Sequence, residues 1–275
     1  MLEANPEKSC CDMEEKAMLE RLREIWMYRD MLRSLVSKEL RARYKGSILG
    51  FFWTFFNPLL MLIIYSLVFS FIMRSAVEKY PMFLFVALLP WNYFANSLVQ
   101  GAGSLVHNAS LIKKVYFPRE VLPLSVVLAN LLNYLLSLLI LIPALLLFKI
   151  RPTVALFAFP FVLLTETLLV IALVLIISVA DVYFRDLEHI TGVFVTAWFF
   201  LTPVIYSVDV IPPKVRSVFF LNPMAHIVES YRKIFYHGVW PDWSSLGYVF
   251  LGCLGFCLLS FALFGQMQRA VAEEI

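Results

Sequence analysis

The sequence predicts an all-α integral membrane protein with six transmembrane helices. Its 275 residues are 61% hydrophobic and 16% charged, whereas a soluble domain is roughly 45–50% apolar and about 25% charged. The hydrophobic residues form long runs of the length that an α-helix needs to cross a bilayer. This composition excludes a disordered chain and argues against a soluble enzyme.

The first predicted element is an amphipathic helix over residues 28–44. Apolar residues recur there at steps of three and four and form one stripe, while the rest of the helix surface is mostly basic. A helix of this kind lies flat at a membrane surface with its apolar face in the acyl boundary. The preceding residues 1–27 are net acidic and are expected to form a cytoplasmic extension.

Six apolar runs follow and are predicted to span the membrane. The third, fourth and sixth runs are the clearest, whereas the second and fifth are interrupted by polar residues and proline. The predicted spans cover residues 51–73, 82–106, 121–148, 154–180, 190–206 and 246–266.

A shorter helix is predicted between the fifth and sixth spans, over Asn222–Tyr236. Asn222 is a favourable N-cap and Pro223 fits the first helical position. A helix of this length covers only about 22 Å, so it cannot cross the bilayer. It is expected to be a short extracellular or re-entrant element whose charged residues face a cavity or each other.

The distribution of basic residues predicts the orientation. With six spans, 15 Lys and Arg residues fall on the side of the two termini and 8 on the other side. The positive-inside rule therefore places both termini in the cytoplasm.

Polar residues inside the spans mark candidate functional positions. Asn92, Asn96 and Gln100 share one helical face, which either packs against a neighbouring helix through hydrogen bonds or lines a wet pathway. Glu166, near the middle of the fourth span, is more consistent with a local hydrogen bond than with proton coupling.

Aromatic residues also gather near the predicted outer halves of the first and fifth spans. They fit an interface belt or a packed core, and they equally fit an aromatic passage on which sugar rings could stack. These residues are Tyr65, Phe69, Phe199, Phe200 and Tyr206.

The sequence contains no pattern that predicts catalysis or cofactor binding. No Gly is followed by Lys, so the phosphate-binding loop of nucleotide hydrolases is absent, and no metalloprotease or calcium-loop motif occurs. We therefore expect no catalytic residue, metal or cofactor on this chain. The net charge of +3 gives no reason to expect a nucleic-acid partner.

Three sequence blocks resemble the ABC-2 type permeases of the polysaccharide and polyol-phosphate export family, which move O-antigen, capsule or teichoic-acid chains. The resemblance extends from about residue 28 to the C-terminus, so residues 28–275 are expected to form one ABC-2 type transmembrane domain. The blocks are KELRARYKGSILG at 38–50 with Trp53 and Asn57-Pro58, LIKKVYFPREVLPL at 111–124, and DVYFRDLEH at 181–189 with FFLTPVIY at 199–206 and LNPM at 221–224.

This resemblance implies a homodimer in the bacterial cytoplasmic membrane, surrounded by lipid and joined by two separate ABC ATPase subunits that bind ATP and Mg. The implied substrate is a polysaccharide or teichoic acid linked to undecaprenyl diphosphate. Arg41, Arg43 and Lys45 are then expected to contact the lipid diphosphate. The expected translocation path contains Tyr65, Phe69, Asn92, Asn96, Gln100, Phe199, Phe200 and Tyr206.

The resemblance also implies two contacts with the ATPase. A cytoplasmic turn would act as the coupling element, and a second loop would complete the contact. The expected coupling residues are Lys113, Lys114, Phe117, Arg119 and Glu120 in the turn and Asp181, Arg185 and Asp186 in the loop.

Three alternatives stay open from the sequence. The nearest is an ABC-2 exporter of a drug or small lipid. A motor-free or proton-coupled carrier would need buried acid–base partners, and Glu166 is the one candidate. A membrane glycosyltransferase would need an acidic donor-binding motif, for which Asp181, Asp186 and Glu188 are the available cluster. Co-purification of an ATPase subunit with this chain would distinguish an ABC exporter from a motor-free carrier and from a glycosyltransferase.

Overall fold

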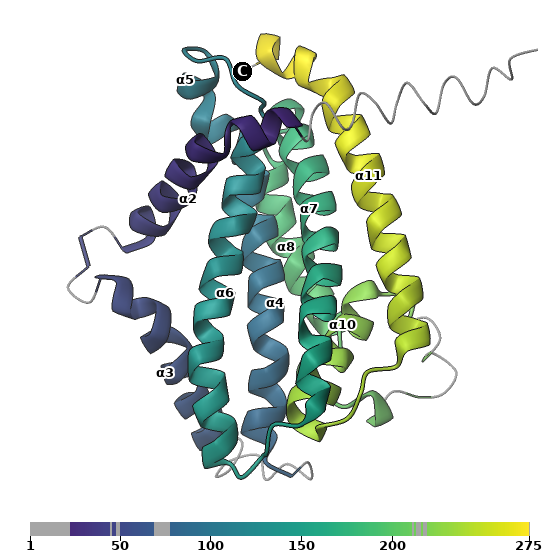
Figure 1. Ribbon diagram of the computed structural model, residues 1–275. Helices are drawn as coiled ribbons and strands as arrows, with labels where there is room; N and C mark the ends of the chain where they lie inside the picture. The colour runs from purple at the N-terminus through teal and green to yellow at the C-terminus, as the bar shows by residue number, and fades with distance from the viewer. Residues whose placement is uncertain are drawn as a thin grey trace, which may run out of the picture.

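The computed structural model describes residues 23–44, 46–47, 50–68, 78–210, 212, 216 and 219–274. These residues form a bundle of α-helices, and no β-strand occurs among them (Figure 1). The predicted all-α class is therefore confirmed for this part of the chain. Most of the predicted N-terminal extension, together with Lys45 and Phe69, lies outside the described residues.

The bundle includes the following α-helices. They are α2 (Arg29–Tyr44), α3 (Trp53–Leu67), α4 (Tyr80–Ala102), α5 (Ala109–Ile112), α6 (Val121–Leu147), α7 (Phe159–Tyr183), α8 (Leu187–Leu201), α10 (Pro223–Arg232) and α11 (Trp243–Glu274). Short 3-10 turns lie at Gly50–Phe52, Val106–Asn108, Val154–Ala158 and Val208–Val210, and a π-helical turn, Lys233–His237, continues α10.

Four helices are long and apolar enough to cross a membrane. They are Tyr80–Ala102, Val121–Leu147, Val154–Tyr183 and Trp243–Gln268. The helices at the predicted first and fifth spans, α3 and α8, are apolar but have 15 residues each, which gives a length of about 22 Å. Six spans in total therefore stay a prediction.

The short fifth helix has a local cause. The predicted span covered 190–206, but α8 ends at Leu201 because Thr202 adopts an extended conformation with φ −109° and ψ 133°. The following residue is Pro203, and a residue before proline disfavours the helical conformation. The chain leaves the helix here and forms a turn over residues 202–206.

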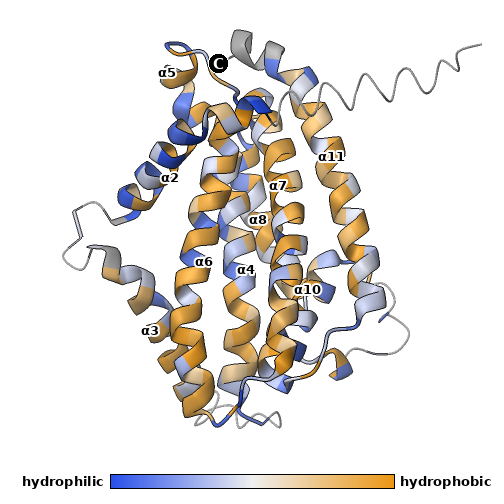
Figure 2. Ribbon diagram, viewed as in Figure 1, coloured by the Kyte–Doolittle hydropathy of each residue, from blue (hydrophilic) through white to orange (hydrophobic). Residues whose placement is uncertain are grey.

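The bundle has two distinct ends. The C-terminal part of α11 lies with α2 and α5 at one end, which we call the α2 end (Figure 1). The opposite half contains α10 and the connection between α6 and α7, and we call it the α10 end. Between the two ends the helix surfaces are largely apolar, whereas polar residues gather at the ends and on α2 (Figure 2), as expected for a bundle surrounded by lipid.

Helix α4 forms the centre of the bundle. It packs against α6, α7, α8 and α10, and its side chains from Tyr80 to Trp91 are all buried. Close approach to α7 depends on Gly101, because a Cβ atom there would lie 2.5 Å from Val174 Cγ1. Small residues allow this kind of close helix contact inside membranes.

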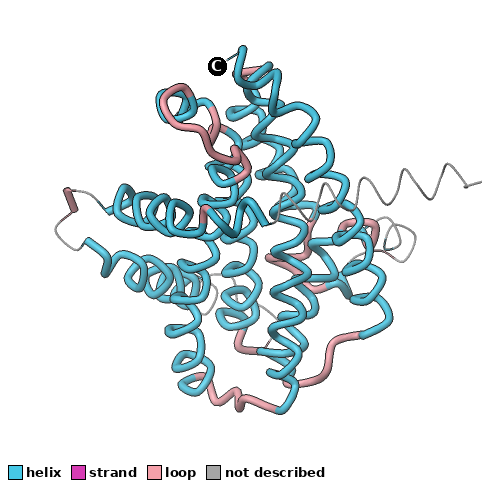
Figure 3. Tube along the Cα trace, turned by 45° about the horizontal axis from the view of Figure 1, so that its top comes forward, coloured by secondary structure: helices cyan, strands magenta, loops and turns pink. Residues whose placement is uncertain are grey.

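Helix α2 begins near its predicted position and packs across α6. Its stripe was expected to face lipid, but Leu35 and Val36 are buried by protein, and Leu35 packs with Phe117 and Leu122. The hydrophobic face of α2 is thus at least partly a protein contact. Figure 3 shows α2 and α3 extending from the same side of the bundle, and the placement of α2 at a membrane surface stays a prediction.

Candidate functional site

A polar cavity of about 330 Å³ lies between α2, α3, α4 and α6. It is lined by five asparagines and three tyrosines in addition to apolar residues, and we call it the amide cavity. Its polar and aromatic lining consists of Arg43, Trp53, Thr54, Asn57, Tyr65, Phe85, Asn92, Tyr93, Asn96, Asn130, Asn133, Tyr134 and Ser137.

The spacing of polar residues on two helices creates this cavity. Asn92 and Asn96 are four residues apart on α4 and therefore lie on one face. Asn133 and Ser137 have the same spacing on α6, and α4 packs against α6. The two polar faces meet where Tyr65 of α3 closes the side of the cavity.

Arg43 connects the surface helix α2 to the two buried helices. Its guanidinium donates a hydrogen bond of 2.5 Å to Asn130 Oδ1 and another to Gln100 Oε1. Asn130 Nδ2 donates to Gln100 Oε1 at 3.3 Å and to the Val126 carbonyl at 3.1 Å. These carboxamides are neutral, so a positively charged group is held at the edge of the amide cavity by dipoles.

Asn133 lines the amide cavity but was not among the predicted path residues. Its Oδ1 and Nδ2 atoms are both buried and have no hydrogen-bond partner among the described residues. A buried polar group in this state costs roughly 1–3 kcal/mol, which a polar molecule in the cavity would offset. The neighbouring Tyr134 ring stacks on Tyr93 with 5.7 Å between centroids and an interplanar angle of 11°, forming an aromatic wall of the same cavity.

The other predicted head-group residues are placed differently. Arg41 is exposed and lines a shallow groove with Arg33, Ser37 and Lys38 on α2 itself. Lys45 lies outside the described residues. Within the described part of the predicted set, Arg43 is thus the basic residue that reaches the amide cavity.

The predicted path residues fall into two groups. Tyr65, Asn92 and Asn96 line the amide cavity, and Gln100 is bonded at its edge. The three aromatic residues of the predicted fifth span lie on α8 and the turn after it instead. Phe199 contacts Trp91 with 5.5 Å between ring centroids, Phe200 follows it, and the Tyr206 hydroxyl donates to the Phe200 carbonyl at 2.8 Å.

The predicted coupling turn lies at the α2 end around a cavity of about 460 Å³. Lys113 and Lys114 are exposed there, whereas Phe117 is buried in the hydrophobic cluster beneath α2. Arg119 is partly buried and Glu120 is 2% exposed. An anchored aromatic residue therefore holds a turn that presents two lysines to the surroundings.

The second predicted loop lies close to this turn. Asp181 is buried, and its Oδ1 accepts the backbone N–H of Glu188 at 3.0 Å. Arg185 and Asp186 are exposed in between. Glu188 Oε2 lies 3.5 Å from His107 Nε2. The start of α8 therefore contacts the 3-10 turn that follows α4.

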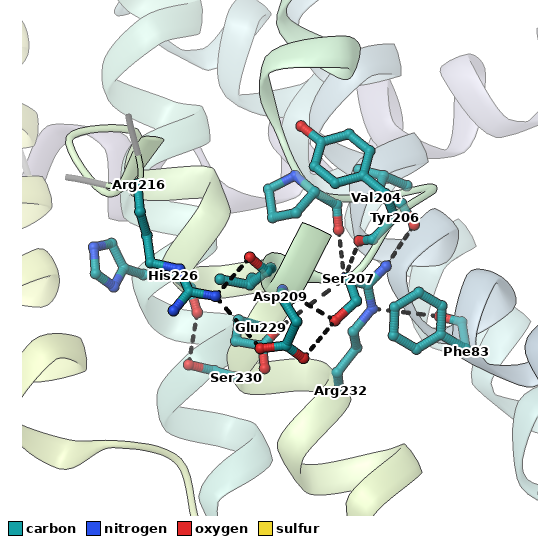
Figure 4. A network of polar contacts seen from close by, with 12 residues as sticks. Phe83, Val204, Tyr206, Ser207, Asp209, Arg216, His226, Glu229, Ser230 and Arg232 are labelled. Atoms are coloured by element: carbon teal, nitrogen blue, oxygen red, sulfur yellow. Dashed lines mark hydrogen bonds and ion pairs between the residues drawn. The ribbon is translucent and has the colours of Figure 1, made fainter. Parts of the chain in front are cut away.

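At the α10 end, one arginine holds several segments together (Figure 4). Arg232 is completely buried. Its Nη1 donates to the Pro203 carbonyl at 2.5 Å, and Nη2 donates to the Val204 carbonyl at 2.5 Å. The guanidinium carbon also lies 3.7 Å from the centroid of the Phe83 ring. Burial lowers the pKa of Arg232 to about 10. This pKa is still well above neutral pH, so the side chain remains charged.

The residue before this arginine makes a contact inside the bundle. The Tyr231 hydroxyl donates a 2.7 Å hydrogen bond to Glu166 Oε2, and both side chains are fully buried. The expected local hydrogen bond of Glu166 is therefore present, and it joins α7 to α10. Asn222 caps α10 as predicted, accepting the Met224 N–H at 3.0 Å.

The described residues contain no group of three or more His, Cys, Asp or Glu side chains that could hold a metal ion. Their candidate site is instead a cavity of amides and aromatic rings beside one arginine. Neutral amides of this kind exchange hydrogen bonds with a polar ligand.

These features define a class of multi-pass helical membrane protein with a polar cavity among its helices. The family model described as ABC-2 type transporter matches residues 31–236. The chain belongs to the ABC-2 type transporter family.

Curated relatives add detail to this assignment. The chain is 40% identical over 262 residues to the O-antigen export system permease protein RfbA of Myxococcus xanthus, covering 94% of this chain and 100% of that protein. It is 33% identical over 250 residues to an O-antigen export system permease protein RfbA of Klebsiella pneumoniae, covering 89% and 94%. It is 25% identical over 251 residues to the polysialic acid transport protein KpsM of Escherichia coli, covering 86% and 93%. The family resemblance inferred from the three sequence blocks is confirmed.

Proposed function

We propose that this chain is the permease subunit of an ATP-driven exporter that moves a polysaccharide across the bacterial inner membrane. The relatives named above as O-antigen export and polysialic acid transport proteins support this role. In this proposal two permease copies form the pathway, and two separate ATPase subunits bind ATP and Mg. Both termini lie in the cytoplasm, and the substrate is a glycan linked to undecaprenyl diphosphate.

The observation that best supports the proposal is the amide cavity beside Arg43. Sugar hydroxyls both donate and accept hydrogen bonds, and the carboxamides of Asn92, Asn96 and Asn133 offer both kinds of partner. The guanidinium of Arg43 can form charge-assisted hydrogen bonds with a phosphate that reaches the same edge. A sugar-phosphate junction would therefore find complementary groups within one cavity.

In this mechanism the lipid diphosphate enters beside α2 and draws Arg43 from its amide partners. Gln100 and Asn130 are then free to bond the first sugar units, so substrate entry exchanges one set of hydrogen bonds for another. ATP binding by the partner subunits moves the α2 end and opens a path between the two permease copies. The aromatic rings along the path contact the sugar faces without holding them tightly.

Replacing Arg43 by glutamine tests this proposal. We expect surface polysaccharide to fall about 10-fold or more, because a charge-assisted hydrogen bond contributes roughly 1.5–3 kcal/mol, and lipid-linked glycan should accumulate inside the cell. The measurement is quantitative blotting of surface glycan in a strain whose own gene is deleted and replaced by the variant. Arg33→Gln is the matched control, since Arg33 is an exposed arginine of the same helix, paired with Asp30.

The amount of variant protein in the membrane is measured in the same cells. Normal export by Arg43→Gln at wild-type protein levels would remove this residue from the mechanism. If deletion of the gene for this chain leaves every surface polysaccharide unchanged, the proposed function itself is contradicted.

Charge reversal of Lys113 and Lys114 to glutamate is expected to uncouple ATP hydrolysis from transport. Both lysines are exposed on the turn that Phe117 anchors, so the substitution alters the contact surface without changing the core. ATP hydrolysis by the purified complex should lose its stimulation by substrate. Lys149→Glu with Arg151→Glu is the matched control, because these exposed cations lie in the connection between α6 and α7. Intact stimulation in the Lys113/Lys114 variant would show that the coupling surface is elsewhere.

A further inference from the structure

A second and larger cavity lies at the α10 end. Its volume is about 680 Å³, and none of its lining residues belongs to the amide cavity. Figure 4 shows part of its wall, where Asp209, Arg216 and Glu229 point toward one another from the loop after α8 and from α10. None of the roles assigned above to the amide cavity or to the α2 end uses this cavity.

One wall of the cavity is fixed by the contacts of Arg232. This buried side chain bonds the carbonyls of Pro203, Val204 and Tyr206, the last at 3.3 Å. Helix α10 and the turn over residues 202–206 are thereby held at a defined separation. A wall whose own polar groups are satisfied in this way is preorganised for a ligand.

Two charged residues of this wall face the cavity, one from α10 and one from the start of the π-helical turn that continues it. Glu229 and Lys233 are four residues apart, and both line the cavity. In the part of the chain that the structure describes, neither side chain accepts or donates a hydrogen bond, and no ion pair within 4 Å joins them. Glu229 Oε2 lies 3.9 Å from Arg232 Nη1, an electrostatic contact that leaves its hydrogen-bonding positions available.

The facing wall is also ordered by its own contacts. Arg216 Nη2 donates to the Val208 carbonyl at 2.8 Å and lies 3.4 Å from Asp209 Oδ1. The Ser207 hydroxyl donates to Asp209 Oδ2 at 3.0 Å. Asp209 and Arg216 are therefore paired with each other, whereas among the described residues Lys233 has no ion-pair partner and Glu229 has only the 3.9 Å contact with Arg232.

Aromatic rings complete the lining. The Phe83 and Tyr236 rings meet edge to face with 5.6 Å between centroids, and both line the cavity. A cavity with a carboxylate, an ammonium group and aromatic edges suits a ligand that has hydroxyl groups and apolar C–H faces. A simple anion would meet the carboxylates of Asp209, Glu229 and Asp242, and an acyl chain would leave the charged groups without partners.

We propose that this cavity is a second saccharide-binding site, which holds a neutral segment of the glycan at the α10 end of the permease. The Glu229 carboxylate accepts hydrogen bonds from two sugar hydroxyls, and the Lys233 ammonium donates to a third sugar oxygen. The aromatic edges contact the sugar ring. This inference rests on the proposed function, because it assigns the same substrate class to a separate site.

The test uses the full-length chain in nanodiscs. The probe is the delipidated polysaccharide whose surface display is lost when this chain is deleted, cut to about ten sugars. We expect Glu229→Gln and Lys233→Gln each to weaken its binding about 10-fold in calorimetry, because each removes a charge-assisted hydrogen bond. Lys149→Gln is the control, since Lys149 is an exposed cation that does not line the cavity.

A second measurement locates the bound glycan. Ser245 lines the cavity, and a Ser245→Cys variant that also has Cys10 and Cys11 replaced by serine can be labelled with a soluble maleimide. The probe should slow this labelling about fivefold, and the added Glu229→Gln substitution should abolish the protection. Cys253 and Cys257 are buried and give the background rate.

The outcomes separate this site from the proposed function. The second site is overturned if the glycan binds all variants with equal affinity and does not change the labelling rate of Ser245→Cys. The proposed export function is not affected by that result. Surface polysaccharide that never depends on this chain would instead overturn the proposed function and, with it, the second site that rests on it.

Discussion

Replacing Arg232 by methionine is expected to destabilise the protein by about 3–5 kcal/mol, because it removes a buried charged donor and leaves several buried carbonyl groups without partners. The Pro203 and Val204 residues that accept from it are themselves buried, so water cannot replace the lost hydrogen bonds. The measurement is thermal unfolding of the detergent-solubilised chain, together with the rate of protease cleavage in the segment between α8 and α10.

Two further variants show whether the loss comes from Arg232 in particular. Arg232→Lys keeps the charge but provides one ammonium group in place of a planar fork, and it should recover a minor part of the stability. Arg216→Met removes an arginine that is 41% exposed and bonds a single carbonyl nearby, and it should cost about 1 kcal/mol or less. Equal losses in Arg232→Met and Arg216→Met would refute the central role of Arg232.

Replacing Tyr231 by phenylalanine should have the second largest effect, a loss of about 1–3 kcal/mol. It removes the donor to Glu166 Oε2, and Glu166 Oε1 already has no partner among the described residues. A buried carboxyl group without any hydrogen bond is strongly unfavourable. Chemical unfolding of the purified chain in mild detergent measures the change.

A double substitution makes this prediction sharper. Tyr231→Phe combined with Glu166→Leu removes both polar partners, and apolar replacement of a buried pair is often close to neutral. The double variant should therefore be more stable than Tyr231→Phe alone. Tyr93→Phe is the control, because its hydroxyl makes a longer bond of 3.3 Å to Thr167 Oγ1. Additive losses in the double variant would mean that the two side chains act independently.

Much of the fold followed from local sequence patterns. The helix over residues 29–44 and the Asn222 cap of α10 were predicted because each depends on neighbours within a few residues. The early end of α8 was open to prediction as well, because Pro203 acts on the residue directly before it.

The partners of individual polar residues were harder to predict. Asn130 and Asn133 are three residues apart on α6, yet the first bonds Gln100 and Arg43 while the second faces the amide cavity without a partner. Periodicity places both residues on one side of the helix, but the difference depends on where α2 crosses α6. That crossing is a tertiary contact for which the local sequence contains no signal.

Arg232 illustrates the same limit. The sequence predicted that the charged residues of the short helix face a cavity or each other, and Glu229 and Lys233 do line a cavity. The partners of Arg232 are the backbone carbonyl of Phe83 and those of residues 203, 204 and 206 in the turn after α8. The carbonyl groups of the turn are free to accept because α8 ends just before them. Every residue has a backbone carbonyl, so the amino-acid sequence of the turn does not indicate that Arg232 binds there.

The adjacency of Tyr231 and Arg232 limits how α10 can move. Successive residues on a helix point about 100° apart, and these two attach α10 to α7 on one side and to the turn after α8 on another. Spinning α10 about its own axis would break both attachments at once. During a transport cycle α10 is therefore expected to be displaced together with α7 and that turn, as one rigid block, rather than to swivel as an independent gate.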